Sequence, residues 1–163
     1  SQGATERLKL LKQQYRFPYM FIQEPMVRAK KIDSFKRKLG YQYCFHNCSN
    51  KIWIFWSSDY NLDILEDREQ QVLVHITQNP GPVDFHLSVV YAKCDENLRR
   101  VLWDELRATA DRIRGPWGVV GDFNVISEPE EKIGGRPFRI EESIDFISCL
   151  SDCDLQDGGF LGS

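Results

Sequence analysis

The segment "WGVVGDFNVISEPEEKIGG", residues 117–135, is an apolar run that ends on two polar side chains, Asp122 and Asn124. Residues i and i+2 of a β-strand project from the same face, so these two side chains are predicted to aim at one point. An Asp or Asn at such a place also forms turns, because each short side chain hydrogen-bonds its own backbone. The pattern predicts a strand over residues 117–123 and leaves open whether its polar end faces solvent, a metal or a phosphate.

A second apolar run, "YMFIQE" at residues 19–24, ends in the same way on Glu24 and is followed by Pro25. A carboxylate at the end of a buried strand is costly to desolvate unless a cation, a hydrogen-bond donor or water compensates it. Mg²⁺ takes only one or two carboxylates and completes its shell with water and phosphate, so Glu24 would suffice as its ligand. Asp122 would then orient or deprotonate a water that attacks phosphorus, while the Asn124 amide donates to the phosphoryl oxygens.

The rest of the chain alternates between two periodicities. Leucines and other apolar residues at helical spacing predict helices over 4–15, 26–40, 94–115 and near 140–153. Gly40 is expected to cap the second helix and Asp95 to begin the third, whose inward stripe includes Leu98, Leu102 and Leu106. Short segments rich in β-branched and aromatic residues predict strands joined as successive hairpins, at 41–45, 51–56, 62–67, 70–77 and 83–92. This order predicts two sheets packed face to face with helices outside.

Composition sets the class of protein. With 163 residues, 42% of them apolar, the chain is long enough for one domain with a real core. The net charge is −3, yet residues 1–40 hold ten Lys or Arg against three Asp or Glu. That asymmetry permits a basic face for a polyanion beside an acidic region that holds a divalent cation. Solvated helix faces explain the same charges equally well.

The cysteines and histidines favour no competing chemistry. Five cysteines, with neither a signal peptide nor an apolar run of membrane-spanning length, indicate a reducing compartment, nuclear or cytoplasmic. Zinc is not expected, because the pairs Cys44–Cys48 and Cys149–Cys153 are more widely spaced than usual zinc pairs. Cys94 lacks an evident histidine partner, so a thiol nucleophile is also not expected.

Three motifs, in this order and with wide spacing, carry a resemblance to a known family: "FIQEP" at 21–25, "VVYA" at 89–92 and "GVVGDFN" at 118–124. Together they resemble the endonuclease/exonuclease/phosphatase superfamily along nearly the whole chain. The continuation "VISEPEEKIGG", residues 125–135, looks like the endonuclease domain of plant LINE-type (non-LTR) retrotransposons, which is similar in turn to apurinic endonucleases.

The resemblance implies a fold and a site. The fold is a four-layer αββα sandwich of two largely antiparallel sheets, and the activity is cleavage of phosphodiester bonds in DNA with Mg²⁺ or Mn²⁺. By this resemblance, Glu24 matches the metal-binding acid, Asp122 the residue that positions the attacking water, and Asn124 the neighbouring amide. Tyr91 matches a tyrosine that hydrogen-bonds near the scissile phosphate. Its alternative role is that of an ordinary strand aromatic with its hydroxyl at the rim.

The loop "EKIGGRPF", residues 131–138, carries Lys132 and Arg136 around two glycines. Beside a phosphodiesterase site these two cations are expected to contact the DNA backbone, since glycine allows close approach and arginine suits phosphate. A plain surface loop is the alternative interpretation.

Two family elements have no match in this sequence. Family members open with a strand that bears an Asn and close with strands that carry an Asp and then an Asp-His pair. The expectation is therefore a single domain, residues 1–163, that is incomplete at both ends. Open sheet edges would invite a dimer or a partner chain to cover them. Three hypotheses follow: a LINE-type endonuclease domain, weak or inactive as an isolated chain; a catalytically dead nucleic-acid or protein interaction module; and a small-phosphoester phosphatase of the same superfamily.

Overall fold

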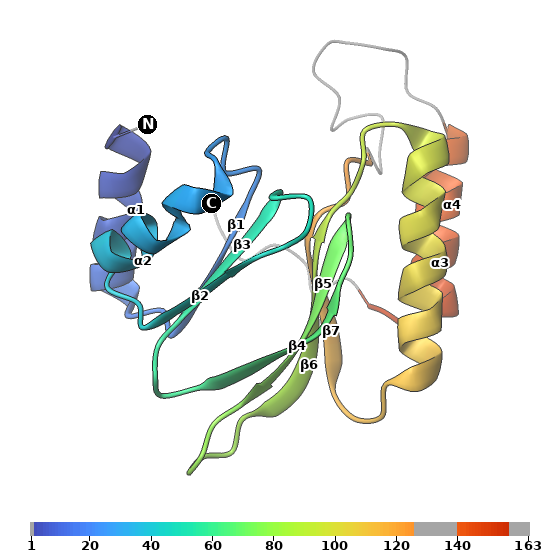
Figure 1. Ribbon diagram of the computed structural model, residues 1–163. Helices are drawn as coiled ribbons and strands as arrows, with labels where there is room; N and C mark the ends of the chain where they lie inside the picture. The colour runs from blue at the N-terminus through green and yellow to red at the C-terminus, as the bar shows by residue number, and fades with distance from the viewer. Residues whose placement is uncertain (1, 126–139, 157–163) are drawn as a thin grey trace. The chain divides into compact units, whose positions relative to one another are not determined.

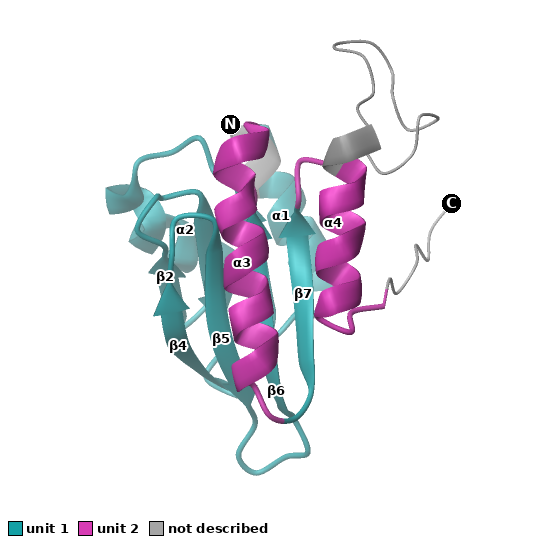
Figure 2. Ribbon diagram, turned by 90° about the vertical axis from the view of Figure 1, so that its right-hand side faces the viewer, with its two compact units in different colours: residues 1–91, 115–122 teal, residues 92–114, 123–163 magenta. Residues whose placement is uncertain are grey.

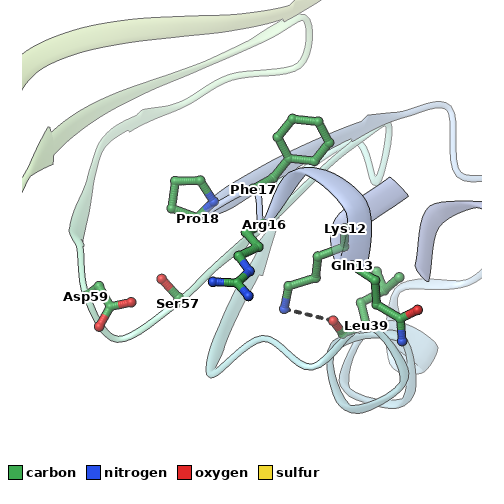
Figure 3. Close-up of a pocket in the computed structure, with 8 residues that line it drawn as sticks. All are labelled: Lys12, Gln13, Arg16, Phe17, Pro18, Leu39, Ser57 and Asp59. Atoms are coloured by element: carbon green, nitrogen blue, oxygen red, sulfur yellow. Dashed lines mark hydrogen bonds between the residues drawn. The ribbon is translucent and has the colours of Figure 1, made fainter. Parts of the chain in front are cut away.

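The computed structural model of the protein describes residues 2–125 and 140–156 (Figure 1). They form two compact units, residues 1–91 with 115–122 and residues 92–114 with 123–163 (Figure 2). In chain order the elements are α1 (Gln2–Tyr15), β1 (Tyr19–Gln23), the 3-10 helix η1 (Ala29–Lys31), α2 (Ile32–Leu39), β2 (Tyr43–His46), β3 (Ile52–Trp56), β4 (Asn61–Asp67), β5 (Gln71–Thr77), β6 (Asp84–Tyr91), α3 (Glu96–Arg112), β7 (Trp117–Asp122) and α4 (Ile140–Asp152).

The first unit contains both sheets. One has three antiparallel strands in the order β1-β3-β2, and the other has four strands in the order β4-β5-β6-β7. The expected hairpins β2–β3, β4–β5 and β5–β6 are present, whereas the chain passes from one sheet to the other between β3 and β4. Strands β6 and β7 are parallel, and a parallel pair needs a long crossover, which contains α3.

Alternation along β3 explains how the first unit is layered. Ile52 and Ile54 project into an apolar core shared with the second sheet, where Val72, Val74 and Val89 are fully buried. The intervening side chains point the other way, because successive strand residues face opposite sides of a sheet. They meet a second core beneath α1 and α2, formed by Ile32, Leu39, Tyr41, Trp53 and Phe55, with Leu8 packed against it.

The second unit is built around the pair α3 and α4. The Trp103 ring lies 5.5 Å from the Phe146 ring and 6.2 Å from the Phe123 ring, between ring centroids. The expected N-cap is confirmed, since the Asp95 carboxylate accepts hydrogen bonds from the backbone N–H groups of Asn97 and Leu98. These contacts fix the start of α3 and the face that it turns towards α4.

The inward stripe of α3 differs from the expected one. Leu102 and Leu106 are fully buried as expected, but the Leu98 side chain is 55% exposed and Arg99 is buried in its place. Arg99 is turned inward because its guanidinium donates to the backbone carbonyls of Lys93, at 3.1 Å, and Asn124. The hydrogen bonds that the guanidinium donates therefore outweigh the hydrophobic spacing at this turn of the helix.

The two sheets and four α-helices of the described residues make an α/β sandwich, so the fold class predicted from the sequence is confirmed. Gly40 caps α2 in the left-handed conformation, as expected. Among the helices of the described residues, we find none with the length and apolar character that crossing a membrane requires.

Candidate active site

Glu24 lies directly after β1, but it is not the buried carboxylate that the apolar run predicted. Its side chain is 45% exposed, so the cost of desolvation is smaller than expected. The backbone of Glu24 is left-handed, with φ of +45°, and Met26 beyond Pro25 has φ of +52°. Non-glycine residues adopt this conformation at a cost, which is commonly tolerated at functional sites.

The Glu24 carboxylate forms an ion pair with Lys51, a residue that no sequence motif singled out. Lys51 precedes β3, which pairs antiparallel with β1 so that Gln23 faces Ile52. The next position of the ladder places Glu24 opposite Lys51, and the Glu24 N–H donates to the Lys51 carbonyl at 2.8 Å. The Lys51 ammonium Nζ then lies 3.1 Å from Glu24 Oε1. The signal that could have located it is a lysine at the start of the strand that pairs with the end of β1.

Tyr91 ends β6 and contacts both members of this pair. Its ring centroid lies 5.5 Å from Lys51 Nζ, and its hydroxyl hydrogen-bonds the Glu24 side chain. The hydrogen bond from Lys51, followed by that from Tyr91, holds the pKa of Glu24 below its ordinary value. The sequence predicted Tyr91 and Glu24 as members of one site, and the structure brings these two side chains into contact.

Asp122 is the last residue of β7 and pairs in register with Tyr91 on the parallel strand β6. Register partners on neighbouring strands lie about 5 Å apart at the backbone, so Asp122 and Tyr91 end their strands side by side. The prediction of a buried strand end is wrong here as well, because the last half of β7 is exposed. The first half of β7, at the same edge of the sheet, is partly buried.

Gly121 sets the approach of β7 to β6. Its φ is +149°, and a Cβ built there would lie against the carbonyl oxygen of Val90. The same oxygen accepts a hydrogen bond from Gln23 Nε2, at 2.5 Å. One carbonyl of β6 therefore connects the ends of β1 and β7, the two strands that carry Glu24 and Asp122.

Asn124 is placed differently from the prediction. Strand β7 ends at Asp122, and Asn124 has a left-handed φ of +49°, so the rule that i and i+2 share a strand face does not apply. The Asn124 Nδ2 donates to the Ala92 carbonyl at 2.6 Å, and its own carbonyl accepts from the Arg99 guanidinium, all within the second unit. Its role towards phosphate stays a prediction. Lys132 and Arg136 lie outside the described residues.

Glu24 is the residue that the sequence predicted as a metal ligand. Within residues 2–125 and 140–156, no cluster of three or more His, Cys, Asp or Glu side chains could hold a metal. Glu24 is a single, half-exposed carboxylate that already has a cation, the Lys51 ammonium, in contact with one oxygen. Mg²⁺ keeps several waters and needs only one or two carboxylates, so Glu24 as its ligand stays a prediction.

The two cysteine pairs differ in how far they are buried. Cys149 and Cys153 are buried one turn apart on α4, and burial raises the pKa of the Cys149 thiol to about 12. Cys44 is partly buried and its Sγ donates to Asp33 Oδ1 at 3.8 Å, while Cys48 is exposed. Burial raises the pKa of Cys44 as well, which disfavours the thiolate that metal binding requires.

No protein-family model matches the sequence, and no curated protein matches it. Solved structures do match. The endonuclease domain of TRAS1, a telomere-specific non-LTR retrotransposon, aligns with 92% of this chain at 16% identity and a TM-score of 0.67. A beta-hairpin deletion mutant of beta toxin from Staphylococcus aureus aligns with 95% at 13% identity and a TM-score of 0.61. An endonuclease/exonuclease/phosphatase family protein from Bacteroides thetaiotaomicron aligns with 74% at 14% identity and a TM-score of 0.55.

This chain spans 64%, 67% and 53% of those three structures, respectively. At such identities the likeness concerns the fold alone. Read together with the two sheets and their helices, it shows that this chain has the fold of the endonuclease/exonuclease/phosphatase proteins.

Proposed function

We propose that this chain is a metal-dependent phosphodiesterase domain that nicks DNA, of the type found in LINE retrotransposons. Two observations support this most: the Tyr91 hydroxyl interacts with Glu24, which is distant in the sequence, and the neighbouring strands β6 and β7 end in register on Tyr91 and Asp122. A hydrolytic site of this kind needs a carboxylate for the metal, a group to position water and a donor to the phosphate.

Each residue has a distinct role in this proposal. Glu24 holds Mg²⁺ or Mn²⁺, which supplies Lewis-acid polarisation of a phosphoryl oxygen. Asp122, exposed at the end of β7, accepts a proton from water and orients it towards phosphorus. The Tyr91 hydroxyl, which hydrogen-bonds Glu24, and the Asn124 amide donate to the phosphate as its negative charge grows.

Basic residues support DNA as the substrate. The segment that follows Glu24 carries Arg28, Lys30 and Lys31, and all three are exposed or partly exposed with no ion pair among the described residues. Cations beside the cleavage site neutralise backbone phosphates without reading the base sequence. In this proposal Lys132 and Arg136 add to the same phosphate contacts.

Nicking of supercoiled plasmid in Mg²⁺ or Mn²⁺ tests the proposal. We expect Glu24→Gln and Asp122→Asn to lower the nicking rate by about 100-fold or more, the usual scale for losing a proton-transfer group or a metal ligand. Asp63→Asn is the matched control, because Asp63 is an exposed carboxylate on β4 and not at these strand ends. Equal activity of all four proteins would assign the nicking to a contaminant and defeat the proposal.

A second candidate is a nucleic-acid-binding module without catalysis. Two observations favour it. The Lys51 ammonium forms an ion pair with the Glu24 carboxylate, and the Asn124 amide donates a hydrogen bond to the Ala92 carbonyl. Such a module would bind DNA with an affinity that falls steeply with salt while plasmid remains supercoiled. Salt-dependent binding by folded protein, with no nicking at any metal concentration, would select this candidate over the first.

A further inference from the structure

Lys51 and Glu24 form an exposed ion pair whose lysine is anchored at its backbone. Their side chains are 43% and 45% exposed. Long side chains with this exposure commonly adopt several conformations. Here the Lys51 backbone N–H donates to Asn47 Oδ1 at 2.9 Å, and Asn47 is fully buried. The same oxygen accepts from the Ile52 N–H at 3.0 Å, so the residue that carries the ammonium is fixed at the start of β3.

Tyr91, at the end of β6 in the other sheet, contacts both Lys51 and Glu24. Its ring lies within cation–π distance of the Lys51 ammonium, and its hydroxyl hydrogen-bonds Glu24. The Glu24 carboxylate therefore has two donors, one of them a full positive charge. A divalent ion on Glu24 would stand within a few ångströms of that charge, where two cations repel each other.

We propose that Lys51 is an internal cation that competes with the divalent metal for Glu24, so that it sets the metal concentration at which the site loads. This inference rests on the proposed function, because it takes Glu24 as the metal ligand. Lysine suits the task since its ammonium is a point charge on a flexible stem, which swings away once the metal arrives. The displaced ammonium remains beside Tyr91, where it is available to a substrate phosphate.

Mn²⁺ binding to the full chain, followed by electron paramagnetic resonance and calorimetry, tests this without requiring catalysis. We expect Lys51→Met to bind Mn²⁺ about fivefold more tightly, because the competing ion pair that it removes is exposed and therefore weak. Lys51→Arg keeps the positive charge and should bind as the intact protein does. Lys30→Met, in η1, removes an exposed lysine from the segment after Glu24 and controls for the general change in charge.

The site of binding is checked in the double variant. Adding Glu24→Gln to Lys51→Met should abolish the gain in affinity, because the competition takes place on that carboxylate. If Lys51→Met binds Mn²⁺ no more tightly than Lys30→Met, or if neither variant nor the intact protein binds it, the inference is wrong. Circular dichroism establishes that each variant is folded, and Lys51→Gln replaces Lys51→Met if the methionine variant is not.

A second measurement uses the intact protein alone. An amine-acetylating reagent, with mass spectrometry of the peptides, reports how accessible the Lys51 ammonium is. Added Mn²⁺ should raise the labelling of Lys51 with the same midpoint as metal binding and leave Lys9, paired with Glu6 at 3.0 Å, unchanged. Labelling that ignores Mn²⁺ would overturn the inference. These readouts are independent of nicking, so the competition can hold in a protein that cleaves nothing, and cleavage can occur in a protein without the competition.

Discussion

The two acids at the strand ends are held by different means. Glu24 follows β1 and is positioned by side chains, with the Lys51 ammonium 3.1 Å from its oxygen and the Tyr91 hydroxyl as a second donor. Asp122 ends β7, and its backbone is placed by the parallel register with Tyr91 and the close approach of Gly121 to β6. Two residues that look alike in the sequence thus depend on different parts of the structure.

This difference predicts which substitutions alter Glu24 and which alter Asp122. Changes in side-chain chemistry around Glu24 alter its charge and its affinity for cations while leaving the strands in place. Changes in backbone freedom beside Asp122 move the strand itself and therefore also act on stability. The predictions below separate these two kinds of control, beginning with the backbone.

Gly121→Ala should have the largest effect on stability. The added Cβ would meet the Val90 carbonyl oxygen and Gln23 Nε2, and the residue would keep a φ of +149°. We expect a loss of about 3 kcal/mol in the free energy of unfolding, the scale of a strained backbone combined with overpacking. Chemical denaturation measures it. The control is Gly118→Ala on the same strand, whose Cβ meets Leu87 Cδ1 at an ordinary 3.6 Å. Equal losses from the two variants would refute backbone control of Asp122.

Asn47→Ala should come next, because it removes the residue that fixes Lys51. Asn47 is buried, its Oδ1 accepts from the Lys51 and Ile52 N–H groups, and its Nδ2 donates to the Arg68 carbonyl at 3.0 Å. Leaving these partners unsatisfied should cost about 2 kcal/mol in the free energy of unfolding. Asn61→Ala, at an exposed position that begins β4, should cost far less in the same denaturation experiment. A small loss at Asn47 would show that Lys51 is held by its side-chain contacts instead.

The sequence located the ends of the strands better than their surroundings. Apolar runs that end on Glu24 and Asp122 are visible locally, as are the capping residues Gly40 and Asp95. These features depend on a few neighbouring residues, so spacing and residue type predict them. The register that places Tyr91 beside Asp122 joins distant segments, and there the resemblance to a family supplied what local patterns lack.

Other features of the site could not be predicted from the sequence, because they depend on the three-dimensional arrangement. The exposure of Asp122 depends on what covers the last half of β7, which an apolar sequence does not reveal. Lys51 becomes the partner of Glu24 only through the pairing of β1 with β3, which are separated by α2 and β2. Asn124 departs from the strand rule because its backbone turns left-handed after β7 ends. In each case a long-range contact or one dihedral angle decided the outcome.

The effect of neighbouring charges on Glu24 is tested by measuring the pKa of its carboxyl in variants, using carbon-13 NMR. Lys51 gives the largest contribution to the lowered pKa of Glu24 and Tyr91 the next. Lys51→Met should therefore raise that pKa more than Tyr91→Phe does, and Tyr91→Phe more than Lys30→Met. If Tyr91→Phe gave the larger rise, the hydroxyl rather than the ammonium would be the main partner of Glu24.

The smallest effect expected is on the pH dependence of stability. Because the pKa of Glu24 is lowered on folding from its ordinary value of 4.5, its ionised form contributes stability that is complete above pH 4.5. That contribution is lost as the pH falls through the lowered pKa, where the folded protein also takes up the proton. Glu24→Gln should thus destabilise the protein slightly at pH 7, and the difference from the intact protein should disappear in acid. In the Lys51→Met background the same substitution should show a smaller difference, since the main cause of the lowered pKa is gone. Denaturation at several pH values between 3 and 7 measures both, and a difference that is constant with pH would mean that Glu24 acts through packing instead of charge.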